Sequence, residues 1–208
     1  NGDLLHIHMQ FSVLAEHMNE WSLVLVSLVD ITARKKAEAY LEYLGQHDVL
    51  TQLRNRAYYV EELNRLARKG TFPLAVLALD LNGLKYINDE FGHAAGDAML
   101  RRTGEVLGKA VSEPGCVARV GGDEFMVLLP GSDARGAQAM QQQIASLVDL
   151  NNQFYQGQPL GLSIGWAVCV AGGQIEAAVN QADEMMYAEK ERYYATVTSD
   201  RRRRWRDD

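Results

Sequence analysis

The chain has 208 residues, of which 47% are hydrophobic and 23% are charged, a composition that excludes a disordered or fibrous protein. Its formal net charge of −6 at pH 7 argues against a broadly basic surface for nucleic acid. No apolar run approaches the roughly 20 residues of a membrane-spanning helix, and no signal peptide opens the chain. We therefore expect a cytoplasmic chain without nucleic-acid or membrane contact. Because Asn1 is not an initiator methionine, we expect it to be a piece of a longer protein, whose membrane anchor, if it has one, lies outside this sequence.

The first 32 residues have the pattern of β-strands. Polar and apolar residues alternate from Leu4 to Met9, and residues 21–29 are rich in valine and leucine. Two strands cannot enclose a core, so we expect them to dock on the rest of the chain, to pair with another chain or to be poorly ordered. The segment 29–38 resembles the last strand and exit helix of PAS sensor domains, which implies that residues 1–32 are the C-terminal fragment of a PAS-like domain.

A helix is predicted over residues 32–46. Ala37, Leu41 and Leu44 have coiled-coil spacing, but only for about one heptad. Residues 33–47 therefore suit a signalling linker between a sensor and the domain that follows. They suit equally a helix packed on its own domain.

The rest of the chain predicts helices that alternate with apolar strands, with one hairpin at the centre. Helices are predicted at 57–69, 96–111, 134–150 and 175–192, and strands at 74–80, 116–120, 125–129 and 160–170. This order predicts an α/β (α+β) fold in which helices flank a mixed β-sheet. Cys116 and Cys169 fall in these apolar strands, which favours buried reduced thiols over a disulfide.

Acidic residues stand beside tight backbone at two places. Asp80 ends the apolar run 75–79, and Asp123 and Glu124 follow two glycines that suit a hairpin turn with close backbone approach. Carboxylates at neighbouring strand ends form a hard-oxygen site suited to Mg²⁺ that carries a nucleotide polyphosphate. Taken singly, each aspartate has a structural alternative, since aspartates also cap helices and favour turns.

Six segments in order resemble the GGDEF family of bacterial diguanylate cyclases. They are D-V-L-T-Q-L-R-N-R at 48–56, the run 80–89 that contains Asp80, N-D-E-F-G-H-A-A-G-D at 88–97, R-V-G-G-D-E-F at 119–125, L-S-I-G at 162–165 and A-D-E-M-M-Y-A-E-K at 182–190. The resemblance implies a GGDEF domain at 48–195 with the ferredoxin-like palm shared with nucleotidyl cyclases and polymerases. It leaves 196–208 as a basic tail, whose arginines at 201–204 and 206 have the pattern of a solvated segment.

The resemblance also implies roles for individual residues. The metal ligands for Mg²⁺, or Mn²⁺, are Asp80, the Leu81 carbonyl, Asp123 and Glu124. The residues implied to bind GTP are Asn82, Gly83 and Leu84 through backbone N–H groups, Gly122 in the turn, Lys85 and Lys190 at the phosphates, and Asn88 and Asp97 at guanine. Asp123, Glu124 and Lys85 are implied to be catalytic. Glu124 is left as a second-metal ligand, as a base for the 3′-hydroxyl or as plain surface charge.

Two departures from the family pattern affect this interpretation. The family's last helix continues to a phosphate-contacting arginine, and its place here is taken by Tyr194. The family's product-inhibition motif R-x-x-D corresponds to residues 112–115, which read S-E-P-G, so the usual inhibitory site is absent. The leading hypothesis is a diguanylate cyclase that joins two GTP into cyclic di-GMP and two pyrophosphates as a homodimer. The alternative is a catalytically weak GGDEF domain that acts as a GTP-binding or protein-interaction signalling module.

Overall fold

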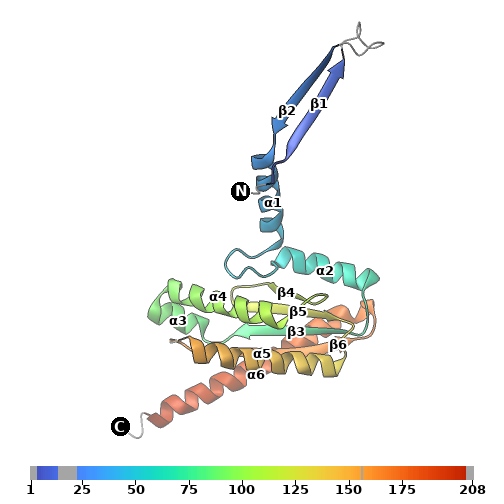
Figure 1. Ribbon diagram of the computed structural model, residues 1–208. Helices are drawn as coiled ribbons and strands as arrows, with labels where there is room; N and C mark the ends of the chain where they lie inside the picture. Colours follow the sequence, from blue (N-terminus) through green and yellow to red (C-terminus); the bar gives the residue numbers. More distant parts are fainter. Residues whose placement is uncertain (1–3, 14–22, 156, 205–208) are drawn as a thin grey trace. The chain divides into compact units, whose positions relative to one another are not determined.

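The computed structural model describes residues 4–13, 23–155 and 157–204 (Figure 1). The chain folds into two compact units, Asn1–Gly45 and Gln46–Asp208. Within the described ranges, no helix combines the length and the apolarity that crossing a bilayer requires.

The first unit is an antiparallel pair of strands followed by a helix. β1 (Ile7–Val13) pairs with β2 (Val24–Asp30), and α1 (Thr32–Gln46) comes next. The Asp30 carboxylate accepts a hydrogen bond from the Thr32 N–H at 2.8 Å. It thereby satisfies one of the N–H groups in the first turn of the helix. The predicted strands and helix are confirmed, whereas the PAS-like origin of the strands stays a prediction.

One face of the β1–β2 pair is apolar. Residues opposite each other in an antiparallel pair lie on the same face. The register brings together Ile7, Met9, Phe11, Val13, Val24, Val26 and Leu28, with Asp30 opposite Ile7 at the end of the pair. Phe11 is 61% exposed and Leu28 is 65% exposed. Among the described residues this face therefore lacks a covering core, as expected for two strands alone.

The second unit is built on a four-stranded sheet of order β4-β5-β3-β6. The strands are β3 (Leu74–Leu81), β4 (Cys116–Arg119), β5 (Glu124–Pro130) and β6 (Leu162–Cys169). All three neighbouring pairs are antiparallel, where we expected a mixed sheet; the parallel element is an isolated bridge between Arg54 and Ala118. If β3 to β6 are renumbered 1 to 4 along the chain, their order across the sheet is 2-3-1-4, which is the ferredoxin-like arrangement. The expected α+β class is confirmed.

Helices cover both faces of this sheet (Figure 1). They are α2 (Arg56–Lys69), α3 (Leu84–Phe91), α4 (His93–Ala110), α5 (Ala134–Phe154) and α6 (Ile175–Arg204), with a short 3₁₀ turn, η2 (Gly172–Gln174), before the last. The last helix extends beyond the predicted 175–192, so the tail expected at 196–208 begins as a continuation of α6. The four strands and the helices α2, α4 and α5 match their predicted ranges within a few residues at each end, whereas no range was predicted for α3 or η2.

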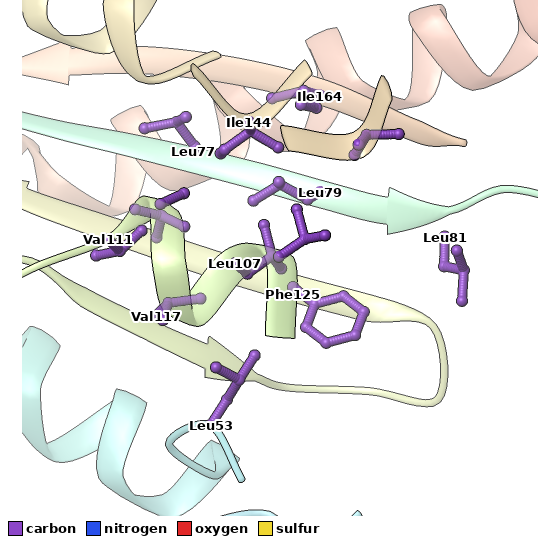
Figure 2. Close-up of a cluster of buried hydrophobic side chains, with 14 of the residues drawn as sticks. Leu53, Leu77, Leu79, Leu81, Leu107, Val111, Val117, Phe125, Ile144 and Ile164 are labelled. Atoms are coloured by element: carbon purple, nitrogen blue, oxygen red, sulfur yellow. The ribbon is translucent and has the colours of Figure 1, made fainter. Parts of the chain in front are cut away.

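The central strand β3 is buried along its whole length because it supplies two cores. Leu77 and Leu79 point into a cluster with Leu107 of α4 and Ile144 of α5, which Figure 2 shows. The alternate residues Leu74, Val76 and Ala78 point into a second cluster with α2 and α6. This alternation explains why the strand reads as a continuous apolar run. Such a strand fixes the position of the polar residue at its end.

Candidate active site

Three acidic residues meet at one end of the central strands. Asp80 is the penultimate residue of β3, and its register partner Glu124 begins β5. The Leu81 N–H donates to the Asp123 carbonyl at 2.9 Å, which holds the turn before β5 against the end of β3. The two acidic segments of the sequence therefore lie side by side.

Asp80 is buried and engaged by a lysine. Its residue is only 2% exposed, and Lys190 of α6 donates to its Oδ2 atom at 2.6 Å. The Lys190 Nζ also lies 3.9 Å from Asp123 Oδ2. Burial raises the pKa of Asp80, and the charges of Asp123 and Glu124 add to this, although Lys190 opposes it. Burial alone would lower the pKa of Lys190, but the hydrogen bond and charge of Asp80 raise it.

This arrangement fits a divalent cation. The Asp80 Oδ1 atom is buried and has no hydrogen-bond partner among the described residues, and a buried carboxylate oxygen normally has one. Asp80 and Asp123 are the hard oxygen donors that Mg²⁺ and Mn²⁺ prefer. In the described part of the chain no three acidic, histidine or cysteine side chains are grouped closely enough to hold a metal by themselves. The two aspartates would therefore hold a cation only together with other oxygen ligands.

The turn that carries Asp123 and Glu124 is held by Arg119. Its Nη2 and Nε atoms donate to the Gly122 carbonyl at 2.8 and 3.3 Å, and its Nη1 atom reaches the two carboxylate oxygens of Asp48 at 3.2 and 3.3 Å. Asp48 also accepts from the N–H and the hydroxyl of Thr51 at 2.8 and 2.7 Å. Burial opposes ionisation of Asp48, but the bonds from Thr51 and Arg119 outweigh it and lower its pKa.

Sequence reasoning assigned no role to Arg119 or Asp48. Both lie inside segments that carry the family resemblance, and that position was the available signal. Their contact joins residues 71 positions apart, so no local pattern predicts it.

The loop from β3 to α3 has its backbone N–H groups partly engaged within the fold. Gly83 has φ +78°, which favours glycine, and its N–H donates to the Tyr194 hydroxyl at 3.1 Å. The Asn82 N–H donates to the Gly161 carbonyl at 2.9 Å, and its buried side chain accepts from the Ser163 hydroxyl at 2.9 Å. The Asn82 N–H, which was expected to face phosphate, is therefore used inside the protein. Sequence reasoning gave Tyr194 no contact at all.

The residues expected at guanine lie on neighbouring helices. Asn88 is on α3 and Asp97 is on α4, and a Cβ atom on Gly96 would overlap the Asn88 side chain. The glycine thus lets α4 approach α3 closely. The Asp97 side chain is 47% exposed, with Arg101 at 3.9 Å. Lys85, expected at phosphate, is exposed in the first turn of α3.

Helix α6 is fixed at the edge of the sheet next to the site. The Glu189 carboxylate accepts from the Ile164 N–H at 2.7 Å, which satisfies a donor of the edge strand β6. Lys190 and Tyr194 lie one helical turn apart and so share a face. Both therefore reach the same end of β3.

Residues 112–115 form the turn between α4 and β4, where the Gly115 N–H donates to the Ser112 carbonyl at 2.9 Å. A cavity of about 720 Å³ adjoins this turn, and its lining includes Glu113, Arg54 and Tyr58 but none of the residues expected in the active site. The Arg54 guanidinium lies over the Tyr58 ring at 4.1 Å. The turn itself presents no arginine or aspartate.

Comparison with known proteins places these motifs in a family. The model of the family described as "Diguanylate cyclase, GGDEF domain" matches residues 45–194. The chain is 34% identical over 167 residues to the probable diguanylate cyclase DgcE of Escherichia coli, covering 77% of this chain and 15% of that protein. It is 29% identical over 160 residues to diguanylate cyclase A of Treponema denticola, covering 73% and 43%. The chain spans between 15% and 22% of the length of several curated relatives.

Solved structures agree with the fold. The coiled coil and GGDEF domain of DgcB from Caulobacter crescentus, in complex with c-di-GMP, aligns with a TM-score of 0.69 at 23% identity, covering 77% of this chain and 88% of that one. The GGDEF domain of TpbB (YfiN) from Pseudomonas aeruginosa aligns with a TM-score of 0.59 at 32% identity, covering 70% and 89%.

Proposed function

Because the chain belongs to the GGDEF family of diguanylate cyclases, we propose that it condenses two GTP into cyclic di-GMP and two pyrophosphates. The observation that carries the proposal is the buried Asp80 carboxylate, whose Oδ1 atom lacks a partner in the described protein beside Asp123 and Lys190. A fold does not need a buried carboxylate with an unmatched oxygen. Binding of a cation that carries a nucleotide explains why this carboxylate oxygen is kept without a partner in the protein.

The residues that would hold Mg²⁺ or Mn²⁺ are Asp80, the Leu81 carbonyl and Asp123, with Glu124 as a further ligand or as a base for the 3′-hydroxyl. The cation would neutralise charge on the phosphoryl oxygens. The remaining work is positioning, which in phosphoryl transfer accounts for most of the catalysis. Arg119 holds the turn of Asp123 in place through the Gly122 carbonyl.

The nucleotide would be bound by groups around the end of β3. Leu84 and Gly83 supply N–H groups at the start of α3, where negative charge is favoured. Lys85 and Lys190 are charged donors for the phosphates. On the neighbouring helices, Asp97 accepts from guanine and Asn88 can both donate and accept. An accepting carboxylate at position 97 suits guanine rather than adenine.

One such site binds one GTP, so turnover requires two domains with their sites facing each other. We infer a homodimer as the active unit for this reason. Residues 1–32 would then be the end of a PAS-like sensor, and residues 33–47 the linker that passes its signal to the cyclase domain at 48–195. The apolar face of the β1–β2 pair supports a role in a larger sensor sheet, because exposed apolar strands require a partner.

A second candidate function is GTP binding without useful turnover. It is favoured by the Tyr194 hydroxyl, which engages the Gly83 N–H that the nucleotide phosphates would use. The two candidates differ in the products they make.

The test is a turnover assay with GTP and Mg²⁺, in which pyrophosphate release and cyclic di-GMP are both quantified across protein concentration. A cyclase releases pyrophosphate and cyclic di-GMP in a ratio of two to one, with specific activity that rises with concentration. Asp123→Asn serves as the control that should make neither. GTP binding without either product at any concentration would establish the second function and refute the first.

A further inference from the structure

Tyr194 makes a contact that the proposed function does not require. Its hydroxyl accepts the Gly83 N–H at 3.1 Å across 111 positions of sequence. The side chain projects from α6, one turn after Lys190, and its ring packs edge-on against Tyr193 with centroids 5.3 Å apart and planes at 79°. Tyr194 is 42% exposed and belongs to neither buried core cluster.

The N–H group that Tyr194 covers has a special position. Gly83 is the N-cap of α3 and has no side-chain cap of its own. N–H groups at a helix start have no acceptor within the helix and favour a negative ligand. Asp80 lies three residues before it, and the unmatched Oδ1 atom of Asp80 is the strongest sign of a cation site here. A nucleotide phosphate held at the start of α3 would meet the Gly83 N–H.

We propose that the Tyr194 hydroxyl competes with the nucleotide: it occupies the phosphate position at the Gly83 N–H. It weakens nucleotide binding, and the nucleotide displaces it on binding. This inference rests on the proposed function, because it takes the β3–α3 loop as the phosphate site. A charged phosphate oxygen is a stronger hydrogen-bond acceptor than a neutral phenol, so the nucleotide phosphate replaces the Tyr194 hydroxyl at the Gly83 N–H. Because the hydrogen bond between Tyr194 and Gly83 must break first, the binding free energy of the nucleotide is less favourable by the free energy of that bond.

Displacement fits the surroundings of Tyr194 better than a relay through its hydroxyl. In a relay, the phosphate would bind beyond the phenol and so farther from α3, where the field of the helix is weaker. An exposed ring at the helix surface, in contrast, leaves its place by a side-chain rotation without opening the core. The two modes predict opposite effects when the hydroxyl is removed.

The experiment measures binding of a GTP analogue with a methylene group between its α- and β-phosphorus atoms, which cannot be turned over. Titration calorimetry with Mg²⁺ compares the unchanged protein with Tyr194→Phe. We expect the variant to bind about fivefold more tightly, since one neutral hydrogen bond no longer competes. The matched control is Tyr193→Phe, which removes the neighbouring hydroxyl from the same helix and should bind as the unchanged protein does. Equal or weaker binding by Tyr194→Phe would overturn the inference.

A second measurement follows the contact itself in the absence of nucleotide. The backbone amide of Gly83 should shift in the NMR spectrum and exchange faster with solvent in Tyr194→Phe, but not in Tyr193→Phe. An unchanged Gly83 amide would also overturn the inference, whatever the protein does with GTP. If the unchanged protein does not bind the analogue at all, the proposed function is refuted, and so is the inference about Tyr194. If the unchanged protein binds the analogue but the two variants bind it equally, only the inference about Tyr194 is wrong.

Discussion

Arg119 is the residue whose loss should separate positioning from binding most clearly. Arg119→Lys keeps the positive charge but replaces a planar fork with a single ammonium. The arginine joins the Gly122 carbonyl to the Asp48 carboxylate, and a lysine can reach one of these partners but not both. We therefore expect the turn that carries Asp123 and Glu124 to loosen while the fold persists.

The size of the effect follows from the contacts. The Arg119 and Asp48 side chains are 14% and 25% exposed, so solvent screens their interaction only in part. A hydrogen bond to a charged group contributes about 1.5–3 kcal/mol. If that energy serves to position Asp123 and Glu124 for the reaction, its loss lowers kcat by roughly 10- to 100-fold.

The assay is cyclic di-GMP formation at saturating GTP, alongside calorimetric binding of the non-reactive analogue and chemical unfolding. Arg68→Lys, an exposed arginine on α2 that reaches the Asn64 carbonyl, is the matched control and should change none of the three. Asp48→Asn should resemble Arg119→Lys, and the double variant should lose less than the sum because both act through one contact. The reasoning is refuted if Arg119→Lys keeps its kcat, or if kcat falls only in proportion to the folded fraction.

Three further outcomes are expected. Asp80→Asn or Asp123→Asn should abolish cyclic di-GMP formation and the rise in melting temperature caused by Mg²⁺, with little change in melting temperature without metal; product formation at the normal rate by either variant would contradict the metal assignment. Specific activity should rise with protein concentration and level off as dimer forms, and a constant value where light scattering shows only monomer would exclude the two-domain mechanism. Inhibition by cyclic di-GMP should be weak and competitive with GTP, because Ser112 and Gly115 offer no arginine or aspartate; saturable product binding that lowers the maximal rate and survives Asp97→Ala would reveal a second site.

The parts of this protein that sequence could predict are those set by local pattern. The run of apolar residues in β3 predicted a buried strand, and it placed Asp80 at the end of that strand, where the structure also has it. Two glycines before Asp123 predicted the turn. These two facts, with the family motifs, were enough to predict that Asp80 and Asp123 meet, as they do at the end of β3.

Sheet direction was not predictable from local pattern, although the family resemblance implied the ferredoxin-like palm whose strand order the structure shows. Helices between strands favour parallel neighbours, and that reasoning led to the expected mixed sheet. In the structure β5 is inserted between β3 and β4, so that every neighbouring pair is antiparallel. The order of strands is decided by packing across the whole sheet, which no single segment encodes.

Long-range side-chain contacts were the second limit, and Tyr194 shows why a residue type alone is insufficient. From sequence, its place in the family's arginine position indicated only a lost phosphate contact. Arginine carries five donors and no acceptor, so it can never take a hydrogen bond from the Gly83 N–H. A phenol oxygen accepts that bond. The same position on α6 thus changes from a group that would bind phosphate together with the backbone to one that competes with phosphate for the backbone, while Lys190, one turn earlier, keeps its charge beside Asp80. On α6, therefore, the Tyr194 hydroxyl would oppose the nucleotide at the Gly83 N–H, while Lys190 would assist it at the phosphates.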